Sequence, residues 1–163
     1  MPATPERTAP DSMRASSNPD GCNPGSALAF DVGTRLIGIA VGHRVSANAR
    51  ALSTIANGDW PRLDALLAEW RPEHLVVGLP LALDGSEQAM TRTARAFAAT
   101  LAKRYARAVH LVDERYTSGE AARRFAEQRA RGVARRKDAS AIDALAAQII
   151  LEAWLADSGA STP

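Results

Sequence analysis

The sequence predicts an α/β domain built on a mixed five-stranded sheet with helices on both faces. Three observations lead to this fold class. Three apolar strand patterns follow one another near the start, two further apolar strands each follow an amphipathic helical pattern, and a long helical pattern closes the chain. Adjacent strands joined by short turns pair antiparallel, whereas strand, helix and strand in succession pair parallel, so both directions are expected in one sheet.

The chain divides into a tail, one domain and a short end. Residues 1–26 contain many Pro, Ser, Asn and Gly residues and almost no large apolar side chains, which is typical of disorder. Residues 27–157 are expected to form one domain, and 158–163 a short flexible C-terminus. A chain of 163 residues with 46% hydrophobic content is long enough for one substantial core.

The first three strands are expected at 27–32, 36–41 and 51–55, the last of them before the turn signal Asn57-Gly58. They are predicted to form an antiparallel meander. A helix is then expected over Asp59–Trp70, because a helix-capping residue and a proline precede leucines at helical spacing.

The second half of the domain alternates strands and helices. The apolar segments 74–78 and 109–112 are predicted to be buried parallel strands. Ser86 is expected to cap a helix that runs to about Arg107, Thr117–Glu120 has the spacing of a capping box, and a last helix is expected over 139–155. The resulting order, β-β-β-α-β-α-β-α-α, is that of the RNase H-like fold.

Composition narrows the possible chemistry. The single cysteine, Cys22, cannot form an internal disulfide, and the spacing of the three histidines is unlike that of a zinc site. The net charge of +2 permits nucleic acid as a partner without requiring it. The sequence contains neither a run long enough to span a membrane nor a signal peptide, so a cytoplasmic protein without membrane contact is expected.

Asp31 is the first candidate functional residue. It interrupts an apolar strand, and a carboxylate in such surroundings has to be paired, hydrogen-bonded or bound to a cation. Gly33 and Gly38 follow it, and the latter leaves space above the sheet, which suggests a site for something bulky and charged. The alternative is a hairpin whose Asp, Gly and Thr serve the turn alone.

Further acids are expected beside Asp31. Asp113 and Glu114 close the strand 109–112, at the end of the sheet where ligands collect. Asp143 lies near the start of the last helix. Because a helix turns by about 100° per residue, Asp143 falls on the apolar face of this helix, which is expected to face the core. An inward acid could also cap a helix or pair with an arginine.

Three converging carboxylates without a Cys or His cluster suit the hard cations Mg²⁺ or Mn²⁺. Two such ions about 4 Å apart can activate a water and stabilise the leaving oxygen of a phosphodiester. The chemistry indicated is metal-assisted phosphodiester hydrolysis, and in the metal-free site the close like charges are expected to raise the apparent pKa of the acids.

Basic residues near these acids are candidates for phosphate contacts. Arg35 could orient a phosphate or pair with an acid, and for Arg115 an ion pair with the neighbouring carboxylates competes with substrate binding. Ser86 at a helix N-terminus could receive a phosphate, or act only as a helix cap in a plain loop. A basic run between the last two helices could bind phosphates or be a solvated connector, and it includes Arg135, Arg136 and Lys137.

Four motifs in sequence order give the chain a family resemblance. They are Asp31-Val-Gly-Thr-Arg-Leu-Ile-Gly38, Val77-Gly-Leu-Pro80 with Asp84-Gly-Ser86, Val112-Asp-Glu-Arg-Tyr-Thr-Ser118 and Ile142-Asp-Ala-Leu-Ala-Ala147. With these motifs the chain, over about residues 27–155, closely resembles the YqgF (RuvX) family of RNase H-like, Holliday-junction-resolvase-like nucleases.

The resemblance implies a metal-dependent endonuclease that processes the 5′ end of pre-16S ribosomal RNA during ribosome biogenesis, with RNA or branched DNA and ribosomal particles as partners. It carries the catalytic and metal-binding acids onto Asp31, Glu114 and Asp143, with Asp113 as an alternate ligand. Junction resolvases have the second acid on the fourth strand, where this chain has Gly78-Leu-Pro80. Glu114 is expected to compensate from the fifth strand, and both monomer and homodimer stay open.

Three other functions stay open at this stage. One is a Holliday junction resolvase-like DNA nuclease, and another is a non-catalytic RNA-binding factor in ribosome assembly. The third is a phosphotransferase of the actin and sugar-kinase type, because Asp-x-Gly-Thr also begins their phosphate loop. The chain length opposes this last class, since those enzymes close two related domains over ATP.

Overall fold

The computed structural model describes residues 21–116 and 139–161. A five-stranded sheet has the order β3-β2-β1-β4-β5. The strands β1 (Asn23–Val32), β2 (Leu36–His43) and β3 (Asn48–Ala56) form the expected antiparallel meander, and β4 (Pro72–Leu79) and β5 (Ala108–Asp113) continue the sheet parallel to β1. The prediction of a mixed five-stranded α/β sheet is confirmed.

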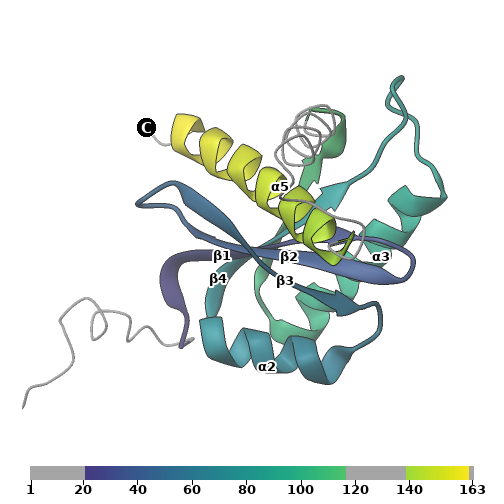
Figure 1. Cartoon of the computed structure of the whole chain (residues 1–163). Coiled ribbons are helices and arrows are strands. Elements are labelled where there is room, and N and C mark those ends of the chain that lie inside the picture. The colour runs from purple at the N-terminus through teal and green to yellow at the C-terminus, as the bar shows by residue number, and fades with distance from the viewer. Residues whose placement is uncertain (1–20, 117–138, 162–163) are drawn as a thin grey trace, which may run out of the picture.

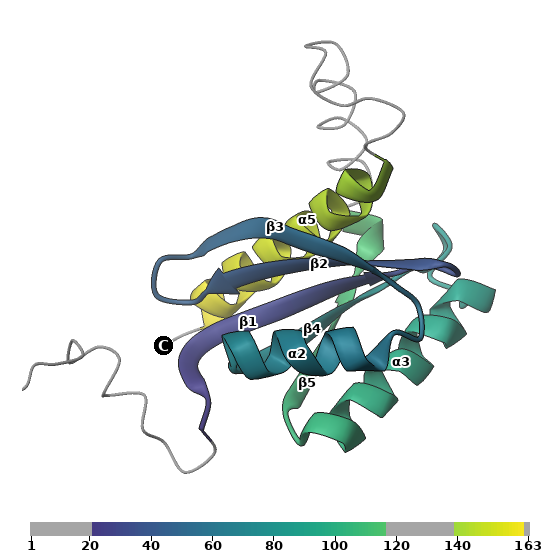
Figure 2. The same ribbon diagram turned by 60° about the horizontal axis from the view of Figure 1, so that its bottom comes forward.

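Helices cover both faces of this sheet. The helices α2 (Trp60–Trp70) and α3 (Ala89–Tyr105) lie on one face, and α5 (Ala139–Ser161) crosses the other (Figures 1 and 2). Successive residues of β1 point to opposite faces, so Leu28 and Phe30 join the core under α2 and α3, whereas Ala27 and Ala29 pack under α5. Asp31 follows this alternation on the α5 side, and its neighbours there are small.

The helix α2 begins as expected. The carboxylate of Asp59 accepts a hydrogen bond from the backbone N–H of Arg62 at 3.1 Å, and Pro61 occupies the first turn. The helix ends at Arg71, which adopts the left-handed conformation with φ of 44°. Its buried side chains, which fall on one face at helical spacing, are Leu63, Leu66 and Leu67.

The prediction that Ser86 caps the next helix is wrong. The helix α3 begins at Ala89 with Gln88 in the capping position, where the Gln88 N–H donates to Thr91 Oγ1 at 2.9 Å. Ser86 instead donates to Asp84 from both its hydroxyl and its N–H, at 2.7 and 2.9 Å. The nearby aspartate offers a local acceptor, and this turn competes successfully with helix initiation.

The predicted boundaries of the domain need two corrections. The first strand starts at Asn23, so residues 23–26 of the expected tail belong to the sheet. They are held there because Asn23 N donates to Arg71 O at 2.7 Å and Gly25 N donates to the carboxylate of Glu73 at 2.7 Å. At the other end α5 continues to Ser161, beyond the predicted limit. Residues 1–20 of the tail and the helix expected after Thr117 lie outside the described residues.

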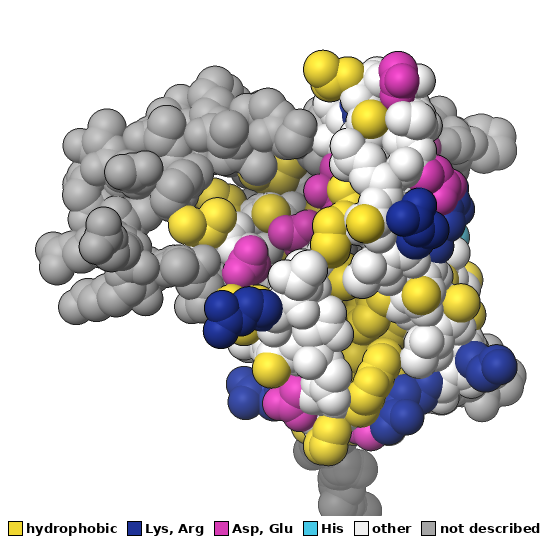
Figure 3. All heavy atoms as spheres, turned by 90° about the vertical axis from the view of Figure 1, so that its right-hand side faces the viewer, with side chains coloured by type: hydrophobic (Ala, Val, Ile, Leu, Met, Phe, Trp, Pro, Cys, Tyr) yellow, Lys and Arg dark blue, Asp and Glu magenta, His cyan; other side chains and the backbone are white. Residues whose placement is uncertain are grey.

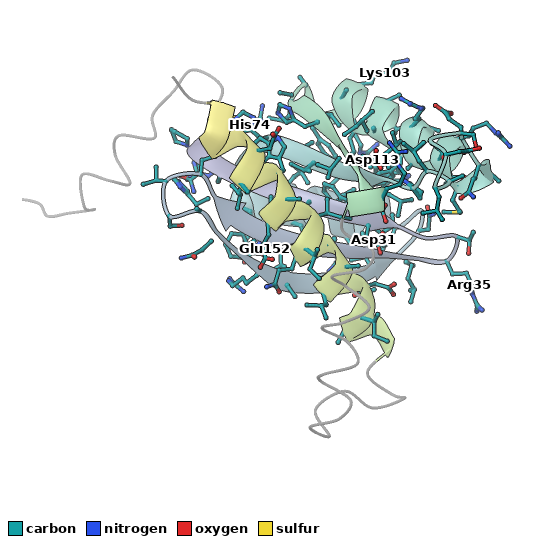
Figure 4. All side chains as sticks on the ribbon, turned by 90° about the horizontal axis from the view of Figure 1, so that it is seen from above. Asp31, Arg35, His74, Lys103, Asp113 and Glu152 are labelled. Atoms are coloured by element: carbon teal, nitrogen blue, oxygen red, sulfur yellow. The ribbon has the colours of Figure 1, made fainter. Side chains whose placement is uncertain are left out.

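Two histidines that are far apart in the sequence meet at the end of the sheet opposite to Asp31, where Figure 4 labels one of them, His74. The parallel register of β4 and β5 brings His74 Nδ1 to 3.1 Å from His110 Nε2, and both rings lie against Trp154 of α5. Burial lowers the pKa of both imidazoles. Sequence spacing did not indicate this pair, because the contact depends on strand register.

Within the described helices, none combines the length and apolar character that crossing a membrane requires.

Candidate active site

The candidate site lies where β1 and β5 end and α5 begins. Asp31 is the penultimate residue of β1, Glu114 directly follows β5 in a single 3-10 turn (Glu114–Tyr116), and Asp143 is in the first turns of α5. This end of the sheet faces the viewer in Figure 3, where several acidic side chains lie near the middle of the view. Strand polarity and helix placement therefore bring together acids that are remote in the sequence.

The two glycines beside Asp31 explain how the other acids come close. Gly38 pairs with Asp31 across β1 and β2, and a Cβ atom at Gly38 would overlap the backbone carbonyl of Asp143. A Cβ atom at Gly78 of β4 would lie 2.5 Å from Glu114 Oε2. The space above Gly38 was expected to hold something bulky and charged, but the backbone of α5 fills it.

Electrostatics couples the three acids through Asp31. Burial raises the pKa of Asp31 to about 6, with a further contribution from the charge of Asp143. Burial also raises the pKa of Glu114 to about 7, and the charges of Asp31 and Asp113 add to it. Burial likewise raises the pKa of Asp143. Among the described residues, Asp31 has no hydrogen-bond donor or cationic partner.

Asp113, the alternate ligand, is engaged elsewhere. Its carboxylate receives three hydrogen bonds from the guanidinium of Arg115, at 2.6, 2.9 and 3.1 Å, and one from the Arg115 N–H at 2.9 Å. These bonds hold the pKa of Asp113 below its usual range. Arg115 also donates to Leu83 O at 3.3 Å. The pair ties the end of β5 to the loop before α3, which favours Glu114 over Asp113 as the acid beside Asp31.

Two other predicted phosphate contacts, Arg35 and Ser86, are exposed side chains in loops. Arg35 is exposed in the turn between β1 and β2 and points outward from the same end of the sheet (Figure 4). Asn57 holds that turn, since its side chain donates to Gly33 O at 2.8 Å and its N–H donates to Arg35 O at 2.9 Å. Ser86 is exposed in the Asp84 turn and lies outside the helix N-terminus. The predicted basic residues Arg135, Arg136 and Lys137 lie outside the described residues.

The carboxylate oxygens suit a hard divalent cation, but the three acids are too far apart, as placed here, to hold one ion together. Carboxylate oxygens are the preferred ligands of Mg²⁺ and Mn²⁺. Over residues 21–116 and 139–161, however, no three His, Cys, Asp or Glu side chains are close enough to hold one ion as they stand. The raised pKa values of Asp31 and Glu114 mean that the protein without a metal ion holds these two protons more tightly than isolated carboxyl groups do.

One stability prediction follows from the raised pKa of Glu114. The folded state holds this proton more tightly than the unfolded chain, so the stability that it contributes is lost as pH rises from about 4.5 to about 7. At pH 8 we expect the free energy of unfolding of Glu114→Gln to exceed that of the parent by on the order of 2 kcal/mol. At pH 4 we expect the two values to be equal. Urea unfolding in EDTA measures the difference.

The control for this prediction is a substitution whose effect on stability at pH 8 is opposite to that of Glu114→Gln. Arg104 and Tyr105 hydrogen-bond to Asp64 and hold the pKa of Asp64 at about 2. Asp64→Asn is therefore expected to lower stability at pH 8, where Glu114→Gln raises it. Equal stability of Glu114→Gln and the parent at pH 8 would show that burial of the Glu114 carboxylate costs the folded state nothing.

The fold and the acidic site together define an RNase H-like domain of the nuclease class. A family model described as "RuvX: Holliday junction resolvase" matches residues 25–157. The chain belongs to the RuvX (YqgF) family, as its motifs predicted.

Curated relatives support this assignment, and one solved structure shares the fold. A protein of Xanthomonas axonopodis pv. citri named "Putative pre-16S rRNA nuclease" is 54% identical over 136 residues, which cover 81% of this chain and 88% of the relative. A relative of the same name from Xanthomonas euvesicatoria pv. vesicatoria is 52% identical over 145 residues, covering 85% and 94%. RuvC of T. thermophilus, solved with a Holliday junction substrate, shares the fold with a TM-score of 0.53 at 17% identity, covering 84% of this chain and 97% of RuvC.

Proposed function

We propose that this chain is a metal-dependent endonuclease that hydrolyses phosphodiester bonds and processes the 5′ end of pre-16S rRNA. The main support is the arrangement around Asp31. The Asp31 carboxylate is half-buried and has no cationic partner among the described residues. It lies between two further acids: the charge of Asp143 raises the pKa of Asp31, and the charge of Asp31 raises the pKa of Glu114. Structural acids are normally paired, so this arrangement favours a role in binding a cation.

In this proposal Asp31, Glu114 and Asp143 hold Mg²⁺ or Mn²⁺. Such ions, when bound, lower the pKa of a water nucleophile and stabilise the leaving oxygen of the phosphodiester. Asp31 is the central acid of the three, because it lies between Glu114 and Asp143. Asp113 keeps Arg115 in place rather than binding the ion, since its carboxylate is fully engaged by the guanidinium.

Basic residues at the margin contact the phosphates flanking the scissile bond. Arg35 projects from the same end of the sheet, and the run containing Arg135, Arg136 and Lys137 precedes the helix that carries Asp143. Arginine forms two parallel hydrogen bonds with a phosphate and gives electrostatic affinity without base readout. The substrate is recognised by its phosphate backbone, within a precursor ribosomal particle in the cytoplasm.

The test compares two nucleic acids. The purified chain is incubated with a precursor rRNA fragment that spans the 5′ end of 16S rRNA, and with a four-way DNA junction, each with Mg²⁺, Mn²⁺ or EDTA. We expect metal-dependent cleavage of the RNA. Cleavage of the junction alone would support the resolvase function that the family description names, and tight RNA binding without cleavage would identify an assembly factor instead.

A further inference from the structure

Asp31 has a glycine beside it on each neighbouring strand. Gly38 of β2 is its antiparallel partner. On the other side, Phe30 of β1 pairs with Val77 of β4 in parallel register, so Asp31 and Gly78 occupy the next positions along the two strands. The row of the sheet that carries the central acid therefore has no side chain on either side of it.

The space over Gly78 holds a carboxylate. A Cβ atom at Gly78 would lie 2.5 Å from Glu114 Oε2 and 3.0 Å from Glu114 Cδ, and it would overlap Ile150 Cδ1 of α5. Glu114 comes from the end of β5, beyond β4 as seen from Asp31. Its side chain therefore extends across β4 toward Asp31, and it does so directly over Gly78.

The backbone conformation of Gly78 does not require glycine. The described glycines with positive φ are Gly21, Gly25, Gly58 and Gly85, and Gly78 is not among them. A glycine inside a strand also lowers stability relative to alanine. What glycine provides here is the room above the strand, and two groups use that room: the Glu114 carboxylate and the Ile150 side chain.

We propose that Gly78 is a positioning residue of the acidic site, whose missing side chain lets the Glu114 carboxylate cross β4 and lie beside Asp31. The catalytic importance of this arrangement rests on the proposed nuclease function. The approach of Glu114 to Asp31 is a property of the metal-free protein, and the raised pKa of Glu114, to which the charge of Asp31 contributes, agrees with it.

The test removes the packing contact first and then fills the space. Ile150→Val deletes the Cδ1 atom that a methyl group at position 78 would overlap. In that background, Gly78→Ala leaves Glu114 as the group that has to move. Gly42→Ala is the matched control, because its methyl group also points at α5, at 2.9 Å from Leu151 Cδ2, but Gly42 pairs with Ala27 rather than with Asp31.

Two measurements on the full chain test the position of the acids: the titration of Glu114 and the affinity for Mn²⁺. By carboxyl NMR in EDTA, we expect Gly78→Ala in the Ile150→Val background to lower the titration midpoint of Glu114 by about one pH unit or more. By calorimetry with MnCl₂, we expect affinity for Mn²⁺ to fall about 10-fold or more. The Gly42→Ala control leaves both values unchanged. An unchanged Glu114 midpoint in the Gly78→Ala variant would overturn the proposal.

A double-mutant cycle keeps the proposal testable if the alanine variant is too unstable for NMR. The loss of unfolding free energy caused by Gly78→Ala is measured by urea with Glu114 present and with Glu114→Ala, both in the Ile150→Val background. We expect a smaller loss when the carboxylate is absent, and an equal loss would refute the role of Gly78. If Mn²⁺ does not bind even to the parent, the metal proposal fails, but the titration and the cycle still decide the role of Gly78.

Discussion

Replacing Asp31 by asparagine is expected to lower the rate of metal-dependent cleavage by about 10³-fold or more. Asparagine keeps the shape of the side chain and removes the charge that lies between the other two acids. The fold is expected to persist, because a carboxyl group with a pKa of about 6 is already partly neutral near neutral pH. Single-turnover cleavage of the precursor rRNA fragment in Mn²⁺ measures the rate, and thermal unfolding in EDTA checks the fold.

Asp113→Asn is the matched control for this experiment. It removes a carboxylate next to Glu114 in the sequence, but one that binds the Arg115 guanidinium instead of facing Asp31. We expect a loss of cleavage below about 10-fold, arising from a looser loop before α3. Cleavage by Asp31→Asn at the parental rate, or a greater loss in Asp113→Asn than in Asp31→Asn, would contradict the assignment of the acids.

Asp31 could be predicted from the sequence because the loss of hydration that marks it is caused by its neighbours in the same strand. A carboxylate between Phe30 and Val32 loses hydration whatever the rest of the chain does. The side of α5 that carries Asp143 could be predicted for a similar reason, since helical periodicity fixes which residues face the core. Both predictions depend on a single element and on no distance between elements.

The choice between Asp113 and Glu114 depended on contacts between elements. Residues at successive positions at a strand end point in opposite directions, so only one of the two could face Asp31, and the sequence does not say which. The Arg115 pair and the space over Gly78 decide it. Gly78 could be read from the sequence, but its position beside Asp31 follows only from the register of β4 with β1.

The misplaced helix start has another physical cause. Ser86 has good capping chemistry, but Asp84 lies two residues before it and accepts both of its hydrogen bonds. The start of β1 was misplaced because Asn23 and Gly25 have weak strand propensity. Their place in the sheet comes from the acceptors Arg71 O and the Glu73 carboxylate, which lie far along the chain.

Gly38→Ala is expected to cause the largest loss of stability among the variants considered. The added methyl group would overlap the backbone carbonyl of Asp143 and lie 2.7 Å from Ala144 N. A backbone cannot turn away as a side chain can. The helix α5 is also fixed by its buried residues against the sheet, which are Ala147, Ile150, Leu151, Trp154 and Leu155.

Accommodating the methyl group therefore requires the start of α5 to rise from the sheet and to carry Asp143 with it. We expect a loss of about 3 kcal/mol or more in the free energy of unfolding and a fall in Tm of roughly 10 °C. At a temperature where the variant is still folded, affinity for Mn²⁺ is expected to fall as well. Calorimetric unfolding and a Mn²⁺ titration measure the two effects.

Gly42→Ala again provides the comparison on the same face of the sheet. Its methyl group would lie 2.6 Å from Asn48 O, in the adjoining strand β3, and 2.9 Å from the end of the Leu151 side chain, which can rotate. We expect this variant to lose less stability than Gly38→Ala and to bind Mn²⁺ as the parent does. A Tm for Gly38→Ala within about 2 °C of the parent would mean that α5 does not lie on the sheet at this point, and Asp143 would then have no fixed place beside Asp31.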